Sequence, residues 1–99
     1  MFIHSVYFWL KDGTPAEARE QLAKDCVDLL TRIPSVRHLW AGKPVASARD
    51  VVDSSYDVGI CVVLDDAAGH DVYQDHPLHK EFIARNKAHW RKIQVYDFR

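Results

Sequence analysis

The chain has 99 residues, with 13 Lys and Arg against 14 Asp and Glu and a formal net charge of −1. This length suits one domain with its own core, so we expect a single domain over residues 1–99. The balanced charge offers no positive field to attract nucleic acid, and no apolar run approaches the roughly 20 residues needed to cross a membrane. An apolar content of 47% and an aromatic content of 11% exclude intrinsic disorder.

The first third of the chain predicts a strand followed by a helix. Residues 2–10 alternate in two sets that are both largely apolar, which is typical of a strand with two covered faces. Thr14 to Glu17 match a capping box with Pro15 at the first helical position, so we expect a helix to begin there and to end before Pro34. The predicted helix has an apolar stripe at helical spacing, formed by Leu22, Cys26, Leu29, Leu30 and Ile33.

The middle of the chain predicts two strands joined by a loop. Residues 36–45 have an extended composition, and Pro44 indicates an edge strand or a strand end because it lacks an amide donor. Residues 46–55 are small and polar, as in a loop. Residues 56–64 alternate with Tyr56, Val58 and Ile60 on one face, and the carboxylate of Asp57 falls on the opposite face. There it must pair with a cation or lie at a rim.

The last third predicts a broken helix and a final strand. Asp65 and Asp66 can cap a short helix that runs to about Asp75, and Pro77 begins a second helical segment. Residues 90–98 alternate again as a strand. The element order is therefore β-α-β-β-α-β, an α+β ferredoxin-like fold in which one four-stranded antiparallel sheet carries its helices on one face.

The other face of that sheet would be left bare and apolar. The side chains concerned are Ile3, Tyr7, Trp9, Cys61 and Val63. A patch of this kind is larger than soluble monomers usually expose. Packing of two sheets about a two-fold axis removes it, so we expect a homodimer through this face.

The two cysteines form no disulfide framework. Cys26 lies on the helical stripe, and Cys61 points to the bare face of its strand, so the two cannot easily pair. We therefore expect free thiols and a cytoplasmic protein.

Four segments together resemble the Dabb family of stress-responsive α/β-barrel proteins. They are residues 2–8, the turn from Ile33 to Gly42, Tyr56-Asp57-Val58, and the segment Tyr73-x-x-His76-Pro77-x-His79. The resemblance covers essentially the whole chain in order. It implies a dimeric α+β barrel built from two ferredoxin-like units, in agreement with the argument from the bare face.

The resemblance also implies a candidate activity. One family member is a plant polyketide cyclase, a lyase or isomerase type of enzyme that closes a linear polyketide by an aldol step with a Tyr and a His. These two residues correspond to Tyr73 and His79 here, and a cavity histidine on the first strand corresponds to His4. The cyclase has a further histidine where this chain carries Val58, so the substrate is not carried over.

The residues themselves support a small-molecule site without a cofactor. His79 lies in the first turn of a helix, where the positive end of the dipole favours a neutral imidazole that can accept a proton. Tyr73 would donate to a carbonyl oxygen, and His4 would lie nearby. We expect a small apolar or aromatic ligand, with no cofactor, in a cavity between helices and sheet lined by Val6, Phe8, Leu22, Cys26 and Ile60.

Two alternative functions remain open. The protein is a non-catalytic stress-response or ligand-binding homodimer if side chains fill the cavity or if the cavity only holds an apolar ligand. It is a cofactor-independent monooxygenase if it resembles other dimeric α+β barrels that act on aromatic substrates. The spacing of His76 and His79 suits metal ligands, but His76 beside Pro77 also suits a helix cap, so we expect no metal there.

Overall fold

The computed structural model describes all residues, 1–99, and has four strands and three helices in one βαββαβ unit. The strands are β1 (Phe2–Leu10), β2 (Val36–Gly42), β3 (Val58–Leu64) and β4 (Trp90–Phe98). The helices are α1 (Ala16–Asp25), α2 (Ala67–Asp75) and α3 (Pro77–Asn86). A π-helical turn (Cys26–Leu30) extends α1, and a 3₁₀ turn (Lys87–His89) joins α3 to β4.

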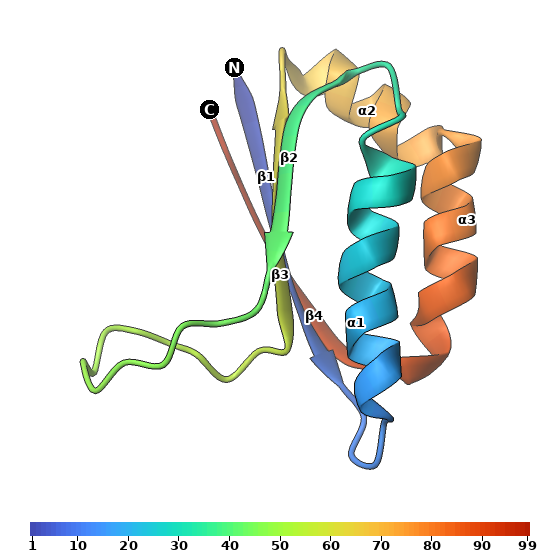
Figure 1. Cartoon of the computed structure of the whole chain (residues 1–99). Coiled ribbons are helices and arrows are strands. Elements are labelled where there is room, and N and C mark those ends of the chain that lie inside the picture. Colours follow the sequence, from blue (N-terminus) through green and yellow to red (C-terminus); the bar gives the residue numbers. More distant parts are fainter.

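The sheet has the order β2-β3-β1-β4, and all neighbouring strands are antiparallel. All three helices lie on one side of the sheet, and the segment between β2 and β3 extends to the other side (Figure 1). This confirms the predicted ferredoxin-like fold. It also confirms β2 as an edge strand, with Pro44 just beyond its end.

The core lies between the sheet and the helices. Alternate residues of β1 and β3 are buried on the helix side, and Val58, Val62 and Leu64 are at most 1% exposed. The predicted stripe of the first helix is fully confirmed: Leu22, Cys26, Leu29, Leu30 and Ile33 are all buried. None of the helices is long and apolar enough to cross a membrane.

A buried polar cluster joins α1 to α3. Asp25, which is 1% exposed, accepts hydrogen bonds from Gln21 Nε2 at 2.6 Å and from Asn86 Nδ2 at 3.0 Å. Asn86 also donates to the carbonyl oxygen of Phe82 at 2.9 Å. Asp25 and Asn86 are therefore both hydrogen-bonded, and the cluster holds the two long helices side by side.

The predicted capping box does not form. The first helix begins at Ala16 with Pro15 as its N-cap, and no side chain caps its amides. The Thr14 hydroxyl instead donates to the carbonyl oxygen of Lys11 at 2.6 Å, in a turn where Gly13 has a φ of 80°. Because the Thr14 hydroxyl is bonded within this turn, it does not cap the helix.

The predicted places of Tyr56 and Asp57 are also corrected, because β3 begins only at Val58. Strand alternation does not extend to these residues. Tyr56 packs on the helix-free side against Tyr7, with ring centroids 5.0 Å apart. Asp57 accepts from the Leu10 amide at 2.8 Å and from Arg19 Nη2 at 3.0 Å, so its cation belongs to α1.

The helix-free face is apolar over most of the sheet, as predicted, with one correction. Trp9 is only 9% exposed, because its indole nitrogen donates to Ser55 Oγ at 3.0 Å and Lys92 covers its ring. The loop between β2 and β3 thus shields one end of the face. Three further aromatic side chains lie on it and are about 60% exposed: Trp40, Tyr96 and Phe98.

Candidate functional site

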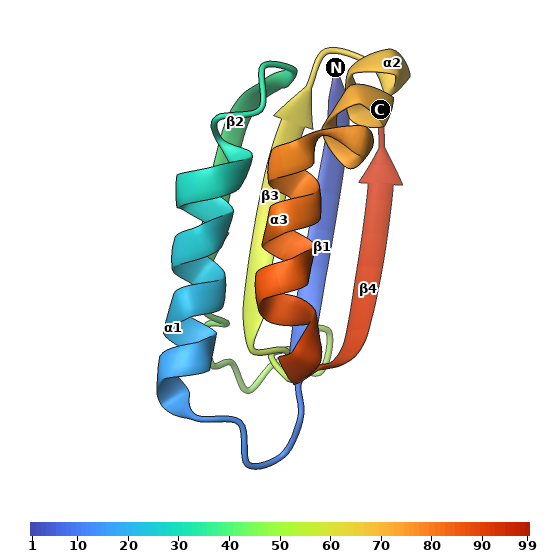
Figure 2. The ribbon, with the colours of Figure 1, turned by 90° about the vertical axis from the view of Figure 1, so that its right-hand side faces the viewer.

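A cavity of about 170 Å³ lies on the helix side of the sheet, over β1 and β4. It exists because the helices cover the sheet unevenly: α1 lies toward β2, and α3 crosses the middle of the sheet (Figure 2). The helix-facing side chains of β4, Ile93 and Val95, are therefore each 41% exposed. The lining residues are His4, Val6, Phe8, Tyr73, Gln74, His79, Ile83, Trp90, Ile93 and Val95.

The fold brings the three predicted catalytic side chains together at this cavity. The ring centroids of His4 and Tyr73 are 5.6 Å apart, and those of Tyr73 and His79 are 4.8 Å apart. The bend between α2 and α3 places Tyr73 opposite His79. His76 stabilises that bend, because its Nδ1 accepts a hydrogen bond from the Leu78 amide at 3.1 Å. This cap engages Nδ1 of His76, as the predicted helix cap requires.

The predicted ligand-contact residues are only partly at the cavity. Val6 and Phe8 line it. Leu22, Cys26 and Ile60 do not, because α1 packs directly on the sheet there and leaves them at most 4% exposed in the core. Burial raises the pKa of the Cys26 thiol to about 12, so this group is an inert core thiol.

His79 has the properties of a neutral base. Burial is the larger cause that lowers its pKa below 6.5, and the neighbouring His4 and His70 lower it further. Its Nδ1 is buried without a hydrogen-bond partner. The sequence predicted a neutral imidazole from the helix dipole, and the structure adds burial as the dominant cause.

Tyr73 and Trp90 supply the donors. Tyr73 is 1% exposed, and burial raises the pKa of its phenol far above 10, so the hydroxyl keeps its proton. The indole nitrogen of Trp90 is buried with no partner in the protein. A buried donor or acceptor left unpaired costs about 1–3 kcal/mol. A ligand with a hydrogen-bond acceptor near this nitrogen would recover part of that cost.

Asp97 is a site residue that the sequence reasoning missed. Its Oδ1 lies 2.6 Å from His4 Nδ1, and the two residues pair directly across β1 and β4. His4 is 4% exposed, and burial lowers its pKa more strongly than Asp97 raises it. The missed signal was alternation: Asp97 falls on the same face of the last strand as Ile93 and Val95, where a carboxylate needs a partner.

We expect His79 to titrate with a pKa below 6.5 in the folded protein, because burial and the two nearby histidines disfavour its charge. NMR of ¹³C-labelled histidine side chains across pH 4–8 measures this, and the missing resonance in His79→Asn assigns the signal. Since the folded state binds this proton less well than the unfolded chain, the free energy of unfolding should fall as the pH drops below about 6.5. A pKa at or above 6.5 would contradict the assignment.

Comparisons with known proteins agree with this fold. The protein resembles a dimeric ferredoxin-like protein of Thermobifida fusca at 23% identity and a TM-score of 0.82, covering 98% of this chain and 88% of that one. A Dabb family protein of Mesorhizobium loti is 24% identical with a TM-score of 0.79, over 99% and 94% of the two chains. A hydroxynitrile lyase of Passiflora edulis is 16% identical with a TM-score of 0.83, over 98% and 90%.

No curated protein sequence matches the chain. The family model of the Stress responsive A/B Barrel Domain (Dabb), in contrast, matches residues 2–99. The match covers nearly the whole chain and agrees with the resemblance carried by the segments around His4 and His79. The chain therefore belongs to the Dabb family of stress-responsive A/B barrel domains.

Proposed function

We propose that the cavity binds a small apolar carbonyl compound and that His79 removes a proton from the carbon next to the carbonyl. The observation that carries this proposal is that a base and a hydrogen-bond donor lie at the same cavity. His79 has an unpartnered ring nitrogen and a lowered pKa, and Tyr73 has a phenol that keeps its proton. Such a division into base and donor is what general acid–base chemistry at a carbonyl requires.

The proton transfer needs no second reactant. The C–H electron pair moves into the new C=C bond of an enolate, and the proton goes to the His79 imidazole. Tyr73 donates a hydrogen bond to the oxygen that gains negative charge. The enolate then takes the proton back from His79 at another position, which is an isomerisation. Alternatively, its carbon attacks a second carbonyl of the same molecule, and the resulting alkoxide takes the proton from His79 as the ring closes.

His4 acts through Tyr73 in this proposal. Its ring packs edge-on against the phenol, with the planes at 68°. The hydrogen bond to Asp97 fixes the orientation of that ring. His4 is therefore a positioning residue, and Tyr73 and His79 are the two catalytic residues.

The volume of the cavity limits the ligand. An engineered cavity of about 150 Å³ is known to hold benzene. The 170 Å³ here therefore fits about one ring with a short substituent. It is too small to enclose a polycyclic phenol, which disfavours the monooxygenase alternative, and large enough to weigh against a cavity filled only by side chains.

A slow hydrogen–deuterium exchange reaction tests the catalytic step. With a one-ring methyl ketone such as acetophenone in D₂O, we expect the protein to accelerate exchange of the methyl protons, measured by ¹H NMR. His79→Asn should lose about 10²–10⁴-fold of that acceleration, because the base is removed. Tyr73→Phe should also slow the exchange by weakening stabilisation of the enolate.

His89→Asn is the matched control, because it changes a histidine outside the cavity-lining set. It should exchange the ketone at the rate of the unmodified protein. Equal rates for the unmodified protein and His79→Asn would contradict the catalytic role. In that case a bound ketone would favour the alternative of a non-catalytic binding protein.

We also propose that the protein is a homodimer through its helix-free face. Trp40, Tyr96 and Phe98 are about 60% exposed there and adjoin the half-buried Ile3 and Tyr7. The segment between β2 and β3 extends on the same side, where it would reach a second subunit (Figure 1). The fold is shared with a protein described as dimeric, and such packing would remove an apolar patch that is costly in water.

Sedimentation at low micromolar concentration tests the dimer. We expect about twice the chain mass of 11.4 kDa for the unmodified protein and a shift toward the single-chain mass for Tyr96→Asp, which places a charge in the interface. Val72→Asp makes a similar change at a 52% exposed position of α2 and should remain a dimer. A single species of 11.4 kDa for the unmodified protein would overturn the proposal.

A further inference from the structure

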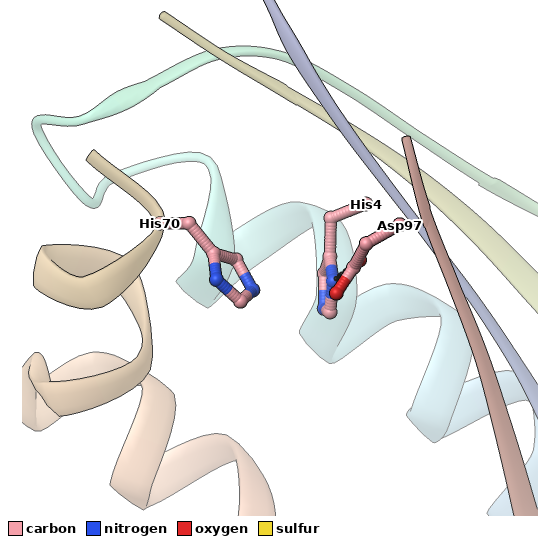
Figure 3. Close-up of side chains that lie close together, drawn as sticks. All are labelled: His4, His70 and Asp97. Atoms are coloured by element: carbon pink, nitrogen blue, oxygen red, sulfur yellow. Dashed lines mark hydrogen bonds and ion pairs between the residues drawn. The ribbon is translucent and has the colours of Figure 1, made fainter. Parts of the chain in front are cut away.

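Three side chains that can bind metal converge at one end of the cavity. They come from three different elements: His4 from β1, His70 from α2 and Asp97 from β4. One ligand atom from each lies within 4.8 Å of the others. In Figure 3 the ring of His70 faces the His4–Asp97 pair across the space between helix and sheet.

The separation of these atoms suits a common ion after small side-chain movements. Protein ligands of Zn²⁺ lie about 2.0–2.2 Å from the metal, which places two tetrahedral ligands about 3.3 Å apart. His4 Nδ1 and Asp97 Oδ1 are 2.6 Å apart, so they would separate by less than about 1 Å. The His4 and His70 rings are tilted by 54° with centroids 4.6 Å apart, a geometry in which ring edges can meet at one point.

The surroundings of His70 favour a ligand state. Its ring stacks on Phe2 at 4.7 Å, which limits rotation. The amide nitrogen of Gln74 lies 3.1 Å from His70 Nε2. Together these two contacts hold the ring in the orientation in which it faces the His4–Asp97 pair.

The hydrogen bond between His4 and Asp97 accounts for those two residues but not for the approach of a second histidine. The ring centroids of His4 and His70 lie 4.6 Å apart, and two imidazoles at this distance repel when both are charged. His4 is buried, whereas the Asp97 side chain is 36% exposed, so an ion can enter from solvent and then be partly shielded. Partial shielding strengthens the attraction between a cation and the carboxylate.

We propose that His4, His70 and Asp97 bind one divalent transition-metal ion, with Zn²⁺ as the best match to two imidazoles and a carboxylate. Ca²⁺ and Mg²⁺ prefer sets of oxygen ligands and are not expected here. Three protein ligands leave at least one coordination position open. Because His4 also lines the cavity, that position lies at the polar end of the ligand site. The site does not depend on the proposed proton transfer.

Metal titration of the full-length, chelator-treated protein tests this inference. We expect calorimetry with Zn²⁺ to show one ion per chain and Co²⁺ to give visible absorption bands of a bound, low-coordinate ion. His70→Gln and Asp97→Asn should each weaken Zn²⁺ binding by at least about 10–100-fold, the loss seen even when an outer partner of a ligand is removed. Neither variant changes Tyr73 or His79.

His89→Gln is the matched control, since it removes a histidine outside the cluster and should bind Zn²⁺ like the unmodified protein. A second readout guards against misfolding: Zn²⁺ should raise the Tm of the unmodified protein and of His89→Gln, but not that of His70→Gln. No binding by the folded, unmodified protein would overturn the proposal. Unchanged affinity in His70→Gln would overturn it as well, because the ion would then bind elsewhere.

Discussion

The helices cover the sheet unevenly, and this determines where the small-molecule cavity lies. Two long helices lie over four strands, and together they leave β4 without a helix above it (Figure 2). The helices pack closely over β3, and core side chains there, such as Leu22 and Val62, are 0% exposed. The same packing stops short of Ile93 and Val95, and the cavity forms along that border.

The border also sets the chemistry of the site. On its core side, burial keeps Tyr73 protonated and His79 neutral. On its outer side, Asp97 reaches solvent and still contacts His4. The donor and the base thus lie in the buried part of the site, and the carboxylate of the carboxylate–histidine pair lies in the part exposed to solvent. The two proposals share His4 but use different neighbours, so acid–base chemistry and metal binding can be tested separately.

Much of the fold could be predicted from the sequence because it follows from local patterns. Alternation in residues 2–10 and 90–98, the stripe through Leu22 and Cys26, and Pro77 at a helix start each specify an element without reference to the rest. Tyr56 and Asp57 were misplaced because alternation was extended into a loop that precedes the strand. The Thr14 capping box failed for a similar reason, since a tighter turn competed for the same hydroxyl.

The site was harder to predict, because it depends on the register of the strands and on the positions of the helices over the sheet. Tyr73 and His79 were found through a family resemblance, not through spacing alone. Asp97 meets His4 only because β1 and β4 pair in one particular register. His70 joins them because α2 lies across the end of the sheet. A helical stripe shows that Cys26 is buried, but it cannot show that the empty volume lies over the neighbouring strand.

NMR mapping of a bound one-ring ketone tests the central claim that the border along β4 is the ligand site. We expect acetophenone to shift the indole N–H of Trp90, the ring signals of His79 and the methyl signals of Ile93 and Val95, all of which line the cavity. Tyr7 and Tyr96, on the helix-free face, should be unaffected. Saturable shifts confined to that other face, or none at the cavity at millimolar ketone, would contradict the account.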